Sequence, residues 1–243
     1  MSAWLFDLGN SRLKCAPLRD GGIGAVIAID HDGNAFADGW EQQLPARFDS
    51  ASVASVAAPA LSVQLLDALT QRCGRISVAR TQAAFDGVRV AYARPERLGV
   101  DRFLALLAAR ARSRQPALVV GVGTALTIDL LDADGLHRGG RIAPSPTLMR
   151  AALHARAPQL PVEGGHWREF ASDTVDALAS GCDGAALGLV VGSIDAATHL
   201  LDARPRLLLH GGGAGALLPR LDAAVHAPAL VVEGLARWAH VGG

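Results

Sequence analysis

Short apolar runs and helical periodicities follow one another along this chain, as they do in α/β proteins. The apolar run at 3–6 ends in polar turn residues and predicts a buried strand. From residue 100 apolar residues recur at helical spacing, which predicts an amphipathic helix over 100–113. We expect further strands at 12–18, 23–30, 51–57, 118–120, 126–132, 136–142 and 206–210, a turn at 20–22, and further helices at 36–47, 60–73, 146–156, 174–201 and from 233.

One arrangement of strand and glycine turn occurs twice. The strand at 3–6 leads into Asp7-Leu8-Gly9-Asn10-Ser11, and the strand at 118–120 leads into Gly121-Val122-Gly123-Thr124-Ala125. A repeat of this length predicts two similar domains that face a shared cleft. The predicted domains are residues 1–115 and 116–243. Glycine turns followed by Ser or Thr are common, so a chance similarity is the alternative.

Composition narrows the functional classes. The 243 residues are half hydrophobic, and 23 basic residues balance 23 acidic ones. Such a chain buries a substantial core and has no basic excess for nucleic acid. Its three cysteines are odd in number and widely spaced, which favours reduced thiols in the cytoplasm. With neither a signal peptide nor a run of roughly 18 apolar residues, the sequence predicts no membrane partner.

The first glycine turn carries residues suited to phosphate. Gly9 lets the backbone approach a ligand closely, and Asn10 tolerates a left-handed conformation. Successive N–H groups in such a turn form an anion-binding concavity, to which Ser11 adds a hydroxyl. Asp7 is placed to hold Mg²⁺ directly or through water, and Lys14, the only lysine, to neutralise phosphate charge. The same residues also fit an ordinary β-hairpin with a surface lysine.

The second glycine turn offers a similar concavity. Thr124 and Thr127 supply hydroxyls, and Asp129 follows on the outgoing strand. The glycines at 211–213 fit either a close approach of adenine or ribose to the backbone or a plain strand-to-helix turn.

The helix predicted from residue 100 begins with an acid and a base. Asp101 and Arg102 lie in its first turn, where the backbone dipole favours anions. Asp101 fits a general base acting on a substrate hydroxyl, and Arg102 fits a bidentate contact to a carboxylate. Helix capping explains an acid at this position equally well. The chain has no GxxxxGK[ST] motif, no GxSxG elbow and no HExxH motif, which excludes the enzyme classes that use them.

Together these residues resemble the type III pantothenate kinases, relatives of actin and hexokinase that make the first phosphorylated intermediate of coenzyme A. The likeness spans nearly the whole chain, with five motifs in the family's order. The matching residues are Asp7, Gly9, Asn10, Ser11 and Lys14; Gly99, Asp101 and Arg102, with Tyr92 upstream; Gly123, Thr124, Ala125, Thr127 and Asp129; Gly139, Gly140, Ile142 and Pro144; and Thr174.

The resemblance implies a fold, a reaction and a site. The fold is α/β, with two ribonuclease-H-like domains of the actin-like ATPase type around a central cleft. The reaction is ATP-dependent phosphorylation of pantothenate with Mg²⁺ in a homodimer, and Asp101 is the catalytic base. The implied ATP-binding residues are Asp7, Gly9, Asn10, Ser11, Lys14, Gly123 and Thr124, the substrate-binding residues are Tyr92, Gly99, Val100, Asp101, Arg102 and Thr174, and the metal-binding residues are Asp7 and Asp129.

Two positions depart from the family pattern. Gly121 stands where the family usually has an aspartate that helps to hold a monovalent cation, K⁺ or NH₄⁺, so no carboxylate binds the ion there. Ser145 follows Pro144 where the family has glycine. Two alternatives therefore stay open: a kinase of another hydroxylated metabolite, and a catalytically weak nucleotide-binding regulatory protein.

Overall fold

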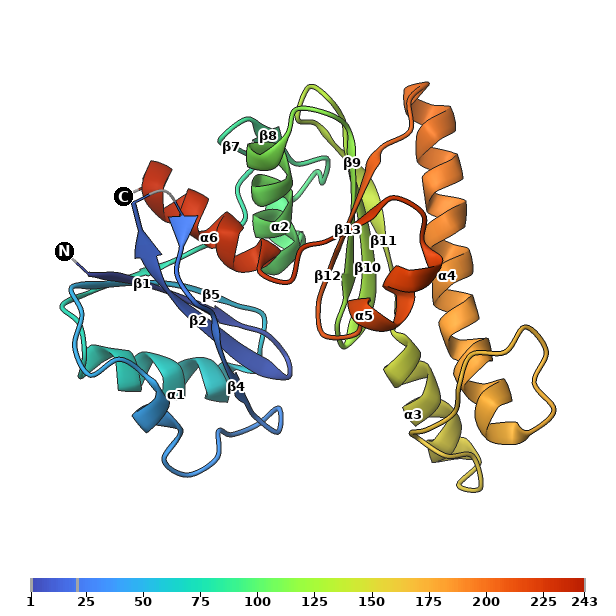
Figure 1. Ribbon diagram of the computed structural model, residues 1–243. Coiled ribbons are helices and arrows are strands. Elements are labelled where there is room, and N and C mark those ends of the chain that lie inside the picture. Colours follow the sequence, from blue (N-terminus) through green and yellow to red (C-terminus); the bar gives the residue numbers. More distant parts are fainter. Residues whose placement is uncertain (1, 21, 243) are drawn as a thin grey trace. The chain divides into compact units, whose positions relative to one another are not determined.

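The computed structural model describes residues 2–20 and 22–242 and divides into two compact units (Figure 1). The first unit contains residues 1–113 and 229–243, and the second contains residues 114–228. Each unit is built on one mixed β-sheet. Gly21, in the turn predicted at 20–22, lies outside the described residues.

The first unit has a sheet of order β3-β2-β1-β5-β6, and β4 also pairs with β2. β1 runs antiparallel to β2 and parallel to β5. A separate two-stranded hairpin, β7 with β8, lies outside this sheet. The elements of the unit are β1 (Ala3–Leu8), β2 (Arg12–Arg19), β3 (Gly22–Ile23), β4 (Ile27–Asp30), β5 (Ser50–Ser55), α1 (Pro59–Thr70), β6 (Arg75–Val78), β7 (Ala84–Phe85), β8 (Val88–Arg89), α2 (Val100–Arg112) and α6 (Leu230–Gly242), with 3-10 turns at Trp40–Gln43 and Pro95–Arg97.

The second unit repeats this topology. Its sheet has the order β11-β10-β9-β12-β13, in which β9 runs antiparallel to β10 and parallel to β12. β9 therefore corresponds to β1, and β12 corresponds to β5. The elements are β9 (Ala117–Val122), β10 (Ala125–Leu131), β11 (His137–Pro144), α3 (Pro146–Arg156), α4 (Thr174–Leu201), β12 (Arg206–His210), α5 (Ala214–Leu217), a 3-10 turn at Leu218–Arg220 and β13 (Ala224–His226). The repeat inferred from the two glycine turns is thus confirmed in the strand pairing.

Alternation along β1 sends its side chains to two different helical layers. Phe6 and Leu8 belong to a core cluster that includes Leu61 and Leu65 of α1. Successive strand residues point to opposite faces, so Asp7 points to the other face. That face is the one covered by α2 and α6, whose contacts with the sheet are to β1, β2, β3 and β5. The strand thus carries an acid on its α2 side and apolar residues on its α1 side.

The long helix α4 packs along one face of the second sheet. Ala186, Val190 and Ile194 of α4 share a core cluster with Val120 of β9 and Ile128 of β10. Among the described residues, one helix, α4, has the length and the apolar composition needed to cross a membrane. Core helices of soluble proteins meet the same two criteria. Ala186, Leu187, Val190, Ile194 and Ala197 of this helix are buried in the cluster on the sheet. The expectation of no membrane partner stays a prediction.

Several segments differ from the sequence prediction. The helix expected at 36–47 is a single 3-10 turn, Trp40–Gln43. Phe36, Trp40 and Leu44 are buried at helical spacing, but Gly39 adopts a left-handed conformation with φ 75° that interrupts any α-helix. Sequence reasoning did not identify β6, the β7–β8 hairpin, α5 or β13, which are short elements of two to four residues.

The terminal helix lies in the first unit, which corrects the assignment of 229–243 to the second domain. α6 packs against α2, and Arg112 makes a bidentate ion pair with Glu233, at 2.7 and 2.8 Å. The two helices approach so closely that a Cβ atom at Gly234 would lie 1.9 Å from the carbonyl oxygen of Leu104. The sequence could not reveal this return, because no local pattern records which sheet a helix covers.

We predict that Gly234→Ala lowers the free energy of unfolding by roughly 1–3 kcal/mol or more, because the added methyl group must push α6 away from α2. Urea denaturation followed by circular dichroism measures the change. The matched control is Gly215→Ala in α5, where an added Cβ atom meets no other atom within 4 Å. Equal stability of both variants would contradict the close helix contact.

Candidate functional site

The first glycine turn joins β1 to β2 in the first unit. The N–H of Gly9 donates to the carbonyl oxygen of Arg12 at 3.0 Å and closes the turn, while Asn10 and Ser11 are exposed. His31, which sequence reasoning missed, braces the turn, since its Nε2 lies 3.0 Å from the Gly9 carbonyl oxygen. The N–H of Gly33 donates to His31 Nδ1, so the proton is on Nε2, which donates to Gly9.

Asp7 and Lys14 lie side by side at the base of this turn. They are direct partners in the antiparallel pairing of β1 with β2, so their side chains share one face of the sheet. Burial raises the pKa of the Asp7 carboxyl to about 7, against the opposing effect of Lys14. Asp101 adds to the rise through its negative charge, which brings the two acids and the lysine into one electrostatic group.

Asp101 lies in the first turn of α2, and its side chain folds back onto the backbone. Its Oδ1 accepts a hydrogen bond of 2.8 Å from the N–H of Arg102. A Cβ atom at Gly99 would lie 2.6 Å from that same oxygen, so the carboxylate adopts this position because residue 99 is glycine. This contact gives the Gly-x-Asp-Arg spacing a physical reason.

Arg102 and Tyr92 meet beside Asp101. The Arg102 side chain is buried, and its Nη1 donates to the Tyr92 hydroxyl at 3.3 Å. Tyr92 lies on the segment between β8 and α2, so the contact joins two parts of the first unit. The structure therefore groups Tyr92, Gly99, Asp101 and Arg102, as the sequence predicted for a substrate site.

The second glycine turn joins β9 to β10 and is held by contacts from three segments of the second unit. The N–H of Gly123 donates to the carbonyl oxygen of Ala125 at 2.9 Å. The N–H of Gly213 donates to the Val122 carbonyl oxygen, also at 2.9 Å. The buried hydroxyl of Ser145 donates to the Thr124 carbonyl oxygen at 3.0 Å and accepts the N–H of Leu148, which caps α3. Thr124 and Gly123 stay exposed at the tip.

Asp129 lies away from the surface in this unit. Its carboxylate is 2.9 Å from Nε2 of His137 on the neighbouring strand, and both side chains are almost fully buried. Such a pair needs no metal to compensate its charge. Among the described residues, no three His, Cys, Asp or Glu side chains gather closely enough to hold a metal ion by themselves. A metal role for Asp129 therefore stays a prediction.

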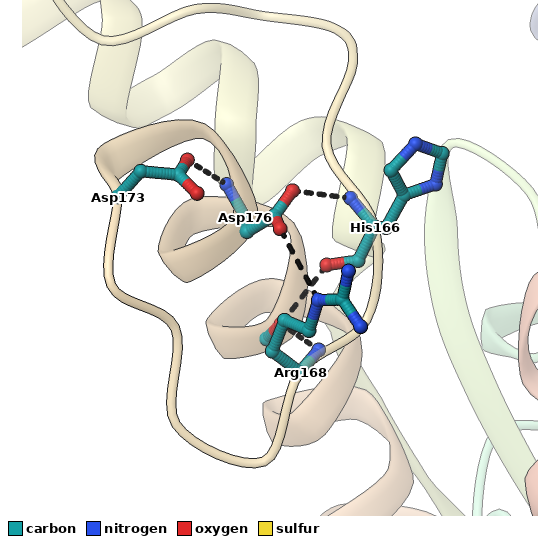
Figure 2. Close-up of polar contacts among 5 residues, drawn as sticks. His166, Arg168, Asp173 and Asp176 are labelled. Carbon is teal, nitrogen blue, oxygen red and sulfur yellow. Dashed lines mark hydrogen bonds and ion pairs between the residues drawn. The ribbon is translucent and has the colours of Figure 1, made fainter.

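Thr174 begins α4, and the preceding loop is fastened to the helix by polar contacts (Figure 2). Asp173 caps the helix by accepting the N–H of Asp176 at 2.9 Å. Asp176 in turn accepts the N–H of His166 at 2.7 Å and pairs with Arg168 at 3.5 Å. These contacts hold the pKa of Asp176 below its usual value, with the His166 hydrogen bond as the largest cause. Thr174, Gly123 and Thr124 belong to the second unit, whereas Asp101 belongs to the first.

Comparison with known proteins identifies the family. A profile of the type III pantothenate kinases matches residues 4–196. The chain is 59% identical to the type III pantothenate kinase of Stenotrophomonas maltophilia strain K279a, and the match covers 98% of each chain. It is 56% identical to that of Xylella fastidiosa strain M23, over 99% of this chain and 98% of the relative. The chain belongs to the type III pantothenate kinase family.

Solved structures share the fold of this type III pantothenate kinase family member. A Campylobacter jejuni protein named for the Baf family of transcriptional activators superposes with a TM-score of 0.62 and 20% identity over 96% of both chains. A Sinorhizobium meliloti protein named as a 2-dehydro-3-deoxygalactonokinase superposes with a TM-score of 0.60 and 16% identity over 98% of this chain and 99% of that one. At such identities the likeness shows the fold alone. The α/β class predicted from the sequence is confirmed.

The raised pKa of Asp7 makes a prediction about stability. An acid whose pKa is higher in the folded than in the unfolded protein stabilises the fold at low pH and loses that contribution as the pH rises through about 7. Between about pH 4 and pH 8, the stability of Asp7→Asn relative to wild type should therefore increase by roughly 2–4 kcal/mol in the absence of ligands.

Urea titrations of both proteins at several pH values measure this difference. The exposed Asp67 on α1 provides the control, since Asp67→Asn should show no such trend. A difference for Asp7→Asn that stays constant with pH would show that the carboxylate is not desolvated in the fold.

Proposed function

We propose that this protein transfers the γ-phosphoryl group of ATP to the primary hydroxyl group of pantothenate, the first step of coenzyme A biosynthesis, in the cytoplasm. Family membership over nearly the whole chain supports the reaction. The observation that carries the residue assignment is the position of the Asp101 carboxylate. It is fixed at the start of α2 by Gly99 and the Arg102 N–H, within electrostatic reach of Asp7.

In this proposal Asp101 orients the acceptor hydroxyl and takes its proton as the oxygen attacks the γ-phosphorus. A positioned base of this kind contributes about 10²–10⁴-fold to the rate. Arg102 binds the pantothenate carboxylate, and Tyr92 keeps the guanidinium in place through its hydroxyl. Each glycine turn offers backbone N–H groups to phosphate oxygens of the nucleotide, and Lys14 neutralises their charge.

The residues around Asp7 fit a divalent cation. A carboxyl group whose pKa is raised by burial to about 7 favours a cation, since binding removes the cost of the buried negative charge. A single protein carboxylate together with nucleotide phosphates is a common ligand set for Mg²⁺. We assign Asp7 to this ion, directly or through water, and the ion would neutralise phosphate charge during transfer.

The exposed side of α4 supports the proposal of a homodimer. Gly181, Gly188 and Gly192 lie on this helix, and an added Cβ atom at any of them would meet no atom within 4 Å. A glycine inside a helix costs about 1 kcal/mol relative to alanine, so close approach by a second chain offers a reason for them. Val191 and Leu200 on the same helix are 47% and 61% exposed. The apolar face of α4 that the sequence marked is largely core, because Leu178, Cys182, Ala186 and Ala197 are buried.

The enzymatic test is incubation with ATP, Mg²⁺ and pantothenate, with ADP and phosphopantothenate as readouts. Asp101→Asn should lower kcat about 10²–10⁴-fold and leave the fold unchanged by circular dichroism. Glu96→Gln, an exposed acid on the segment before α2, is the control that should keep wild-type turnover. Wild-type turnover in Asp101→Asn would overturn the base assignment. ADP formation only with another acceptor would favour a kinase of a different metabolite. Nucleotide binding without ADP formation would favour a regulatory protein.

The dimer is tested by light scattering coupled to gel filtration. The wild-type protein should elute as a dimer at micromolar concentration, and Gly188→Arg should elute as a monomer, because the new side chain occupies the exposed side of α4. Gly74→Arg is the matched control, since Gly74 is also exposed and an added Cβ atom there meets no atom within 4 Å. A monomeric wild-type protein would count against the proposal.

A further inference from the structure

Gly121 lies on β9 between two polar residues of the neighbouring strands. It pairs with Thr127 of β10 on one side and with His210 of β12 on the other. Directly paired residues on neighbouring strands point to the same face of a sheet. Thr127 and His210 therefore flank residue 121 on one face, which is opposite to the face packed by α4, since Val120 and Val122 belong to the α4 cluster.

The space above Gly121 is already filled. A Cβ atom at this residue would lie 2.7 Å from Thr127 Oγ1, 2.9 Å from His210 Nε2 and 3.0 Å from His210 Cε1. Real Cβ atoms essentially never have contacts this short, so any larger residue requires the hydroxyl and the imidazole to move. Gly121 has no side chain, and the space that a side chain would occupy is filled by Thr127 of β10 and His210 of β12.

This arrangement does not fit the monovalent cation that the family resemblance implies. K⁺ is bound by oxygen ligands that replace its hydration shell. The aspartate that would provide such oxygens is absent, and a ring edge with a nitrogen atom fills its place. An imidazole offers the ion no oxygen, and a protonated imidazole repels it.

The strand end that carries His210 is fixed against the second glycine turn. Gly211 follows with φ 93°, and a Cβ atom there would lie 2.3 Å from the Val122 carbonyl oxygen. The N–H of Gly213 donates to that same oxygen at 2.9 Å. The half-buried His210 is therefore held beside the backbone that leads to Gly123 and Thr124. Gly211 and Gly213 thus allow close packing onto the turn.

We propose that His210 takes over the role of the monovalent cation at the second glycine turn. Its imidazole, above Gly121, donates a hydrogen bond to an anionic oxygen of the bound nucleotide, and nucleotide binding requires neither K⁺ nor NH₄⁺. This inference rests on the proposed function only in that the ligand is a nucleoside triphosphate or diphosphate.

The test compares nucleotide affinity and turnover in buffers whose monovalent cation is K⁺, NH₄⁺ or choline. Calorimetric titration with ADP and Mg²⁺ gives an affinity that does not depend on catalysis. The wild-type affinity and kcat should agree within about twofold in the three buffers. His210→Ala should bind ADP about 10–100-fold more weakly, as expected for loss of a hydrogen bond to a charged group. His226→Ala, an exposed histidine at the end of β13, is the matched control and should bind as wild type does.

A double variant tests the exchange directly. Gly121→Asp with His210→Ala restores a carboxylate and removes the ring that blocks it. We expect its ADP affinity to be at least tenfold higher in K⁺ than in choline, whereas wild type shows no such difference.

Other outcomes decide against the proposal. A wild-type affinity or kcat that rises tenfold or more with K⁺ overturns it, and so does a folded His210→Ala with wild-type ADP affinity. If His210→Ala does not fold, the wild-type comparison and His210→Gln, whose amide can still donate, decide the question. If the protein binds ADP but phosphorylates no pantothenate, the proposed function fails, while the cation comparison still tests the role of His210.

Discussion

Burial of the first strand on both faces is the constraint that organises each unit of this protein. β1 and β9 each lie between an antiparallel and a parallel neighbour, so their backbone groups are paired along the strand and their side chains are covered. Each of these strands ends at a glycine turn, which the N–H of Gly9 or of Gly123 closes with a hydrogen bond. The proposed nucleotide contacts at Gly9 and Gly123 therefore lie where a buried strand ends. This follows from the requirement that buried backbone groups find partners.

The polar groups that do enter the interior are held in pairs or have a proposed ligand. Arg102 contacts Tyr92, and Asp129 contacts His137. Asp7 differs, since Lys14 and the neighbouring Asp101 act on it in opposite directions and burial prevails. The buried negative charge of ionised Asp7 is costly for the fold, and a bound cation relieves that cost. The stability of the ligand-free fold therefore favours a neutral Asp7, whereas the proposed Mg²⁺ site uses its charged form.

Each departure from the family pattern is accompanied by contacts of neighbouring side chains in the second unit. Gly121 is accompanied by Thr127 and His210, which occupy the volume above it. Ser145, which replaces a glycine of the family motif, ties the second turn to the start of α3 through its buried hydroxyl. In both places a change at one position coincides with contacts that hold the same turn. The second turn therefore keeps its structure with a different set of supporting side chains.

The sequence alone predicted the repeated turns, the fold class, the bounds of α3 and α4, and the candidate residues around Asp101. These features depend on contacts between residues close in the chain, or on motifs whose spacing is itself the signal. It did not predict the brace from His31, the pairing of Asp129 with His137, or the approach of His210 to Gly121.

It also assigned α6 to the wrong unit. The periodicity of an amphipathic helix shows which side is buried, but it does not identify the surface that buries it. The sequence determined where the longer strands and the two glycine turns lie. Only the tertiary structure decided which distant side chains meet above a glycine, because that choice depends on volume shared between strands that are far apart in the chain.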